Sequence, residues 1–182
     1  MPGITCSMTH TASATTLAGG GGDDYYVVDS TSDVIVENAG EGSGDAVYST
    51  VDYVLGSNLE VLVLQDSAMR GTGNAQANSL YGNGLANTLD GGLGNDWLSG
   101  GAGGDIFVFR IGDGRDHIDD FVAGAGVGDV IELRGGMSSF ADVMAHSALV
   151  GADVVITLSA NDSIALHNVT LSQLHANDFV FA

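Results

Sequence analysis

Glycine and aspartate recur in this chain at a spacing that suits the binding of a hard cation through oxygen atoms. Two adjacent segments, 91–99 and 100–108, fit the pattern G-G-x-G-x-D-x-U-x, where U is a large apolar residue, and segment 19–27 fits it far upstream. A turn that aims several backbone carbonyls at one point needs backbone angles that glycine tolerates and other residues resist. Such converging carbonyl and carboxylate oxygens suit Ca2+, which takes about six to eight oxygen ligands, better than octahedral Mg2+.

These turns belong to a nine-residue repeat that runs without a gap from Gly73 to Val108. The eighth place of each unit holds a large apolar residue, namely Leu80, Leu89, Leu98 and Phe107. This period is neither that of a helix nor that of an ordinary strand. A unit so short can form only one tight turn and one short strand, and it can bury its apolar residue only by stacking on its neighbours. The repeat therefore predicts a solenoid with its chemistry in the turns.

The repeat resembles the RTX family, whose hemolysin-type nonapeptides form a parallel β-roll. The resemblance implies a mainly β fold, a right-handed parallel β-roll or β-helix solenoid, in which two nonapeptides make one coil. It also implies several Ca2+ ions in rows between the turns of successive coils. Carbonyl ligands are then expected from the turn glycines and carboxylate ligands from the turn aspartates, at Gly19, Gly20, Gly22, Asp24, Gly91, Gly92, Gly94, Asp96, Gly100, Gly101, Gly103 and Asp105.

The first two nonapeptides depart from this pattern. Asn78 and Asn87 stand where aspartate is expected, and Gln76 and Leu85 replace the fourth-place glycine. A neutral amide can donate an oxygen to a cation but adds no charge. These corners are either weak cation sites or hydrogen-bonded asparagine turns, and we expect the second.

After the repeat, the pattern returns once with a short insert. The resembled family usually closes its roll with D-x-I-x-D-F, which corresponds here to Asp116, Ile118, Asp120 and Phe121. The resemblance implies that Asp116 and Asp120 are further Ca2+ ligands. Asp113 and Asp119 could equally be solvated charges. His117 alternates with an inward Ile118, so we expect it to be exposed rather than catalytic.

The charge of the chain restricts its partners. Among 182 residues, 23 are acidic and 4 are basic, which gives a formal net charge of −19. This excess opposes compaction unless cations neutralise it, and it disfavours nucleic acid and anionic membrane surfaces as partners. We expect no membrane span. A single cysteine, Cys6, permits no internal disulfide and is interpreted as an incidental thiol.

The segments before the nonapeptides predict a leader and then wider coils. Residues 1–18 lack the basic and apolar regions of a Sec signal peptide, and they form either a leader or a degenerate repeat with Leu17 at the apolar place. Residues 24–65 contain four β-rich bursts separated by turns and resemble the stretch that precedes the repeats in many RTX proteins. The turn at 41–45 is one residue longer than the family form, so Asp45 is assigned no metal role. The tyrosines of this stretch are expected to pack within strands rather than to form a carbohydrate platform: Tyr25, Tyr26, Tyr48 and Tyr53.

The composition changes after the repeats. Residues 129–133 predict a strand, 138–148 a short helix behind a serine cap, 152–159 and 163–169 a hairpin, 171–177 a second short helix and 178–182 a final strand. The end resembles T-L-x-x-L-x-x-x-D-F-x-F, which in RTX proteins lies in the type I secretion signal region. The glycines at 124–128 precede a strand pattern, so they do not open a dinucleotide-binding helix. We expect core or surface roles, and no common site, for the dispersed histidines His146, His167 and His175.

These observations predict three regions. Residues 1–18 are a leader or a degenerate repeat, residues 19–120 a Ca2+-binding roll with its nonapeptide core at 73–108, and residues 121–182 a cap with a secretion signal region. The expected function is a secreted bacterial module that folds on binding Ca2+ outside the cell and engages type I secretion machinery. An alternative is a polysaccharide-binding module similar to those of alginate epimerases, although the four arginines are few for a polyanion. We expect no enzyme, because the chain has no G-x-S-x-G, H-E-x-x-H or P-loop motif.

Overall fold

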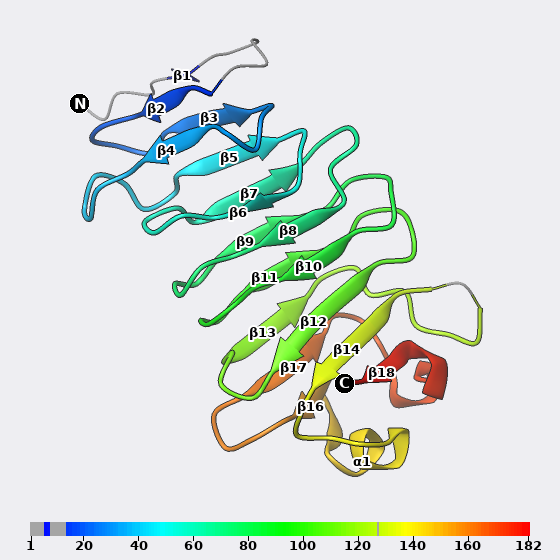
Figure 1. The fold of residues 1–182 in the computed structure, drawn as a ribbon. Helices are drawn as coiled ribbons and strands as arrows, with labels where there is room; N and C mark the ends of the chain where they lie inside the picture. Colours follow the sequence, from blue (N-terminus) through cyan, green and yellow to red (C-terminus); the bar gives the residue numbers. More distant parts are fainter. Residues whose placement is uncertain (1–5, 8–13, 127) are drawn as a thin grey trace.

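A computed structural model of the chain describes residues 14–126 and 128–182, together with the backbone of residues 6–7. The described strands form two long sheets that face each other and a small separate ribbon (Figure 1). The ten-stranded sheet has the order β1 (Cys6–Ser7), β3 (Tyr25–Val28), β5 (Ala46–Ser49), β7 (Val61–Leu64), β9 (Ser79–Tyr81), β11 (Trp97–Ser99), β13 (Arg115–Ile118), β17 (Ser163–Leu166), β16 (Asp153–Thr157) and β15 (Ser147–Val150).

The six-stranded sheet has the order β18 (Phe179–Phe181), β14 (Val130–Arg134), β12 (Ile106–Arg110), β10 (Thr88–Asp90), β8 (Arg70–Thr72) and β6 (Tyr53–Val54). The two-stranded ribbon pairs β2 (Thr16–Ala18) with β4 (Val34–Val36). All pairings of the described strands are parallel except those of β15 with β16 and β16 with β17. Successive strands along the nonapeptides alternate between the two long sheets, so the chain winds as a parallel β-roll and the predicted fold class is confirmed.

The register of the roll explains the nine-residue period. In the ten-stranded sheet Leu62 pairs with Leu80, and Leu80 pairs with Leu98. In the six-stranded sheet Leu89 pairs with Phe107. One unit therefore supplies a strand to one sheet and the next unit supplies a strand to the other. The predicted burial of the eighth place is confirmed, because Leu80, Leu89, Leu98 and Phe107 are all 0% exposed.

The carboxy-terminal elements cover one end of the roll. The expected helix is α1 (Phe140–Ala145), whose N-cap Ser139 accepts a hydrogen bond from the backbone of Asp142. The expected hairpin is β16 with β17, and the expected final strand is β18. Residues 171–177 contribute two short 3-10 helices, Leu171–Gln173 and Ala176–Asp178, in place of one helix. No helix within 14–126 or 128–182 is long and apolar enough to cross a membrane.

Two regions join the roll more closely than their sequences indicated. Leu17 is 4% exposed, packs in the hydrophobic core and pairs with Ile35 of β4. The sheets continue across the expected boundary between roll and cap at residue 120, since β14 pairs with β12 and β17 pairs with β13. Cys6 lies in β1, and nothing is described of its side chain.

Candidate metal sites

The turn glycines that carry the sequence pattern adopt backbone angles that favour glycine. The second and fourth places of the patterned turns have φ between +84° and +143°, at Gly20, Gly22, Gly92, Gly94, Gly101 and Gly103. A Cβ atom at Gly94 would lie 2.5 Å from the carbonyl oxygen of Gln76, and one at Gly103 would lie 2.6 Å from that of Leu85. The glycines therefore let the turns of successive coils approach closely, with carbonyl groups of one coil facing the next.

A ladder of hydrogen bonds connects the aspartates on each side of the roll. The backbone N–H of Asn78 donates to Asp96 Oδ1 over 2.8 Å, and the N–H of Asp96 donates to Asp116 Oδ1 over 2.9 Å. On the other side, the N–H of Asn87 donates to Asp105 Oδ1 over 2.8 Å. Each aspartate thus fixes its own carboxylate against the backbone of the preceding coil.

The second carboxylate oxygen of these aspartates makes the turns suitable for a cation. Asp96 Oδ2 and Asp105 Oδ2 are buried and have no hydrogen-bond partner. Each lies against the first glycine of its turn, because a Cβ atom at Gly91 would overlap Asp96 Oδ2 and one at Gly100 would overlap Asp105 Oδ2. A buried anionic oxygen without a partner is costly unless a positive charge compensates it. The residues of both turns therefore fit the Ca2+ that the repeat implies.

Burial also changes the acidity of this ladder. It raises the pKa of Asp96 to about 6 and that of Asp116 to about 7, and the neighbouring carboxylates add to the shift. Burial raises the pKa of Asp105 as well. These carboxylates are therefore disfavoured as anions until a cation offsets their lost hydration.

The turns of the first two nonapeptides are built differently. The amide oxygen of Asn78 accepts the backbone N–H of Asn74 over 2.7 Å, and its Nδ2 donates to the carbonyl of Leu59 over 3.0 Å. Asn87 makes the matching bonds with the N–H of Asn83 and the carbonyl of Ala68. Both side chains are engaged as donor and acceptor, as expected for hydrogen-bonded asparagine turns.

The residues that follow the repeat include one that sequence reasoning missed. Asp129 Oδ1 accepts the N–H of Asp105 over 2.8 Å, as Asp116 does for Asp96 on the other side. In the segment G-D-V-I, Asp129 lies two residues before Ile131, which is the spacing of aspartate and buried apolar residue in the repeat. The glycine-rich loop before it breaks the nine-residue count, so the sequence pattern did not point to Asp129. Asp120 accepts the backbone N–H groups of Gly100 and Gly101 and the Ser99 hydroxyl. Asp113 is buried, whereas Asp119 is exposed.

At the upstream turn, Asp24 and Asp45 repeat the same arrangement. The N–H of Asp24 donates to Asp45 Oδ1 over 2.8 Å, and a Cβ atom at Gly42 would overlap Asp45 Oδ2. At the preceding turn a Cβ atom at Gly19 would overlap Asp24 Oδ2. Asp45 therefore occupies the place of a turn aspartate even though its turn is one residue longer than the family form, because the extra residue is absorbed within the turn.

Two expectations about aromatic residues need correction. His117 is not exposed but half-buried, since its ring stacks on Trp97 with centroids 4.0 Å apart. Burial lowers the pKa of His117. Tyr26 is fully buried as expected, but Tyr25 is 43% exposed because it points outward in the alternation of β3 and contacts Tyr48. His146 and His175 lie at the surface, as expected, while His167 lies 5.6 Å from His117 between ring centroids.

Comparison with known proteins identifies the family. The model of the peptidase M10 serralysin C-terminal family matches residues 15–182, which is most of the chain. The chain belongs to the serralysin C-terminal family. That family is a non-catalytic, calcium-binding RTX-type β-roll of type I secreted bacterial proteins, so the recognition of an RTX repeat and a secreted localisation is confirmed.

The chain is also similar to parts of larger proteins. The chain is 43% identical over 139 residues to the endo-1,3-1,4-beta-glycanase EglC of Rhizobium meliloti, covering 76% of this chain and 29% of that protein. It is 36% identical over 144 residues to the endo-1,3-1,4-beta-glycanase ExsH of the same organism, covering 79% and 30%. The chain thus spans less than a third of the length of these curated relatives. The extracellular lipase LipA from Serratia marcescens shares the fold, with a TM-score of 0.62 at 17% identity, over 92% of this chain and 38% of that structure.

Proposed function

We propose that this chain is a non-catalytic module that binds several Ca2+ ions in its turns and folds when it does so outside the cell. The observation that carries the proposal is the pair of buried, unpartnered oxygens Asp96 Oδ2 and Asp105 Oδ2, each held against a glycine turn. When bound, Ca2+ supplies the positive charge that these oxygens lack. Gly91, Gly92, Gly94, Gly100, Gly101 and Gly103 are proposed as carbonyl ligands and Asp96 and Asp105 as carboxylate ligands.

The electrostatics of the whole chain support the same proposal. A net charge of −19 disfavours a compact state, and the roll concentrates that charge in stacked turns. Binding free energy at sites that exist only in the folded chain contributes directly to folding free energy. Where Ca2+ is scarce, as in the bacterial cytosol, the chain would stay open, which suits export through type I secretion machinery. The carboxy-terminal elements, proposed to span 121–182, would then cover the end of the roll.

The test is a Ca2+ titration of the chain from an EGTA-stripped start, with Mg2+ as the control. Far-ultraviolet circular dichroism reports the sheets. Fluorescence of Trp97, the single tryptophan, reports the turn that ends at Asp96. We expect both signals to change together and cooperatively with Ca2+ and to change little with Mg2+. A chain that is already folded in EGTA, with signals indifferent to Ca2+, would overturn the proposal.

A polysaccharide-binding role is a second candidate, favoured by one surface feature. Tyr81 and Trp97 are 39% and 41% exposed on neighbouring strands of the ten-stranded sheet, and Trp97 is braced by His117. Aromatic rings exposed in this way can pack on the apolar faces of sugar rings. Two relatives carry the name of endo-1,3-1,4-beta-glycanase, which makes a mixed-linkage β-glucan the natural probe.

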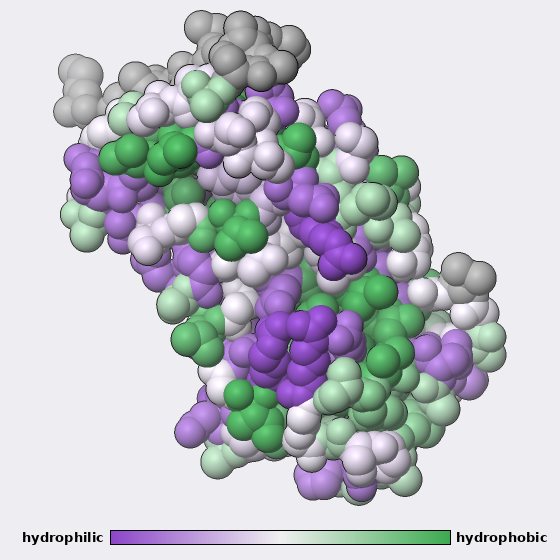
Figure 2. All heavy atoms as spheres, in the orientation of Figure 1, coloured by the Kyte–Doolittle hydropathy of each residue, from purple (hydrophilic) through white to green (hydrophobic). Residues whose placement is uncertain are grey.

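The opposite sheet offers less to an anionic glycan. Figure 2 shows hydrophilic side chains gathered over the region of β12 and β14. There Arg110 pairs with Asp90 at 2.9 Å, and Arg134 pairs with Glu132 at 2.6 Å. Two of the three arginines on the strands of this sheet are thus already paired with carboxylates, which argues for a neutral glycan over a polyanion. Affinity electrophoresis in gels that contain β-glucan tests this role. The wild type and Val54→Ala, a change on the other sheet, should be retarded by the glucan, whereas Trp97→Ala should not. If glucan changes the mobility of none of these three proteins, the role is excluded.

A further inference from the structure

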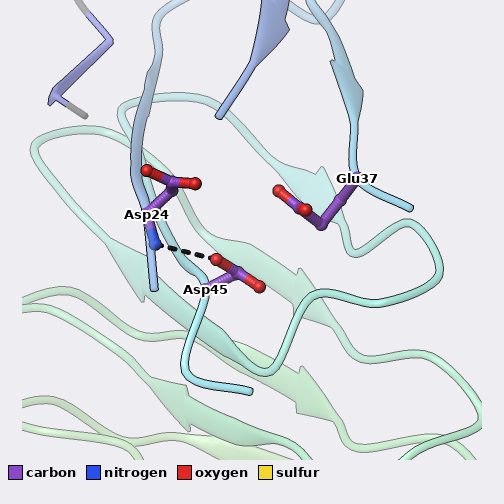
Figure 3. Close-up of side chains that lie close together, drawn as sticks. All are labelled: Asp24, Glu37 and Asp45. Atoms are coloured by element: carbon purple, nitrogen blue, oxygen red, sulfur yellow. Dashed lines mark hydrogen bonds between the residues drawn. The ribbon is translucent and has the colours of Figure 1, made fainter. Parts of the chain in front are cut away.

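Three carboxylates from separate segments meet near the amino-terminal end of the roll, outside the contiguous nonapeptides at 73–108. Asp24 directly precedes β3, Asp45 directly precedes β5, and Glu37 directly follows β4. One ligand oxygen from each lies within 4.8 Å of the others. Figure 3 shows the three side chains turned toward a common space, with Glu37 reaching it from the side opposite Asp24. Among the residues that the structure describes, this is the one group of three potential ligands so close together.

The burial of this cluster distinguishes it from an ordinary acidic patch. Asp45 is 0% exposed; its Oδ1 accepts the N–H of Asp24, while its Oδ2 is buried with no hydrogen-bond partner. Glu37 Oε1 is likewise buried without a partner, and Glu37 Oε2 accepts the Tyr26 hydroxyl. Buried polar atoms normally have a partner, so two orphaned anionic oxygens side by side require an explanation.

No side chain within the surrounding sequence can supply the compensating charge. Residues 14–69 contain no lysine, arginine or histidine, and the first arginine of the chain is Arg70. The ion pairs that the described residues form all involve Arg110, Arg134 or His167, far along the chain. Asp23 and Glu41 add further negative charge close to the cluster. Desolvated carboxylates at this density are stable as anions only beside a cation.

We propose that Glu37 joins the turn aspartates Asp24 and Asp45 in a Ca2+ site that clamps the two-stranded ribbon to the ten-stranded sheet. Three carboxylates offer a hard, oxygen-only donor set of irregular geometry, which suits Ca2+ better than Mg2+. Glu37 follows β4 of the ribbon, whereas Asp24 and Asp45 precede strands of the long sheet. Among the described strands, the ribbon pairs with neither long sheet, so an ion shared by the three would tie the amino-terminal coil together.

The contacts of Glu37 support this clamping role. Its carboxylate accepts from Tyr26, whose hydroxyl oxygen in turn accepts the N–H of Gly19 over 3.0 Å. Its backbone carbonyl accepts Nδ2 of Asn58 over 3.0 Å, from the next coil. Glu37 is therefore held from both sides with Oε1 left available for a ligand. The proposal deepens the calcium-binding function above and rests on it, but of its three residues only Asp24 belongs to the nonapeptide pattern, whereas Glu37 and Asp45 do not.

The experiment is calorimetric titration of the full chain with Ca2+, comparing wild type with Glu37→Gln. The amide oxygen of glutamine can still accept from Tyr26, so the substitution removes charge with little change in shape. We expect Glu37→Gln to bind one ion fewer and to keep the circular dichroism spectrum of the Ca2+-saturated roll. Glu132→Gln, in β14, is the matched control and should bind the full number. An unchanged number of ions in Glu37→Gln would overturn the proposal.

A second measurement on the wild type keeps the test decisive if Glu37→Gln fails to fold. Carbodiimide labelling read by mass spectrometry follows Glu37 and Glu132, two half-buried glutamates, in EGTA and in Ca2+. Ca2+ should slow the labelling of Glu37 by a factor at least about fivefold larger than that for Glu132, because only Glu37 would be a ligand. Equal protection would reject the site. If the wild type binds no Ca2+ at all, the proposed function fails; if it binds Ca2+ while Glu37 and Glu132 behave alike, only this inference fails.

Discussion

The backbone N–H of Asp105 donates to Asp129 Oδ1 over 2.8 Å, across an interval of 24 residues that includes the glycine-rich loop after the roll. The same contact joins Asp96 to Asp116 on the other side. Asp129 Oδ2 also accepts the N–H of Val122 over 2.8 Å. One carboxylate therefore closes the ladder on its side of the roll and fixes the loop that leads to β14.

Asp129→Ala should destabilise the chain, because it leaves the buried N–H of Asp105 and the part-buried N–H of Val122 without acceptors. Each such loss costs about 1–3 kcal/mol, so we expect about 2–6 kcal/mol in total. Urea unfolding in saturating Ca2+ measures the change. Asp119→Ala, at an exposed carboxylate, should stay within about 0.5 kcal/mol of wild type. Equal midpoints for the two variants would show that the contact with Asp105 contributes little.

Gly94→Ala should disrupt the turn that carries Asp96. The φ of Gly94 is +132°, and a Cβ atom there would lie 2.5 Å from the carbonyl of Gln76. We expect a loss of more than about 1 kcal/mol together with weaker Ca2+ binding. Gly84→Ala is the control, since a Cβ atom at Gly84 meets nothing within 4 Å and its φ is not positive. Ca2+ titrations followed by Trp97 fluorescence should separate the two; matching curves would contradict the role of the turn glycine.

Asn78→Asp should not create a stronger metal site but should weaken the turn. Nδ2 of Asn78 donates to the carbonyl of Leu59 over 3.0 Å, and a carboxylate would face that carbonyl without a proton to donate. We expect a loss of about 1–3 kcal/mol in saturating Ca2+. Thermal unfolding of the variant and of the wild type in saturating Ca2+ tests this. A variant that is more stable than wild type in Ca2+ would indicate that the asparagine turns are weakened cation sites.

Without Ca2+, the chain should become more stable as the pH falls from 8 to 5. The folded-state pKa values of Asp96 and Asp116 are raised to about 6 and about 7 from 3.8. The folded chain therefore binds protons that the unfolded chain does not, and this contribution is lost as pH rises through the folded-state values. Circular dichroism in EGTA between pH 5 and 8 measures the folded fraction, which should rise toward pH 5. In Ca2+ the trend should reverse, because metal binding requires the deprotonated carboxylates; a flat or opposite trend in EGTA would contradict the cited shifts.

The amino-acid sequence was sufficient to predict the fold class, the period and the backbone geometry of the turn glycines. A nine-residue repeat with one apolar place can bury that residue only by stacking, so the spacing alone assigns Leu80, Leu89, Leu98 and Phe107 to the core. The positive φ angles of Gly92 and Gly94 were equally implicit in the glycine spacing. The loss of charge at Asn78 and Asn87 indicated turns of another kind.

The three-dimensional fold was needed to show which residues from irregular segments join these ladders. Asp45 and Asp129 follow insertions that break the nine-residue count, and Glu37 belongs to no repeat, so spacing could not relate them to Asp24 or Asp105. The stacking of His117 on Trp97 also depends on strand register across 20 residues, not on local alternation. Periodicity predicts contacts where coil length is constant; where coil length varies, strand pairing alone brings the side chains together.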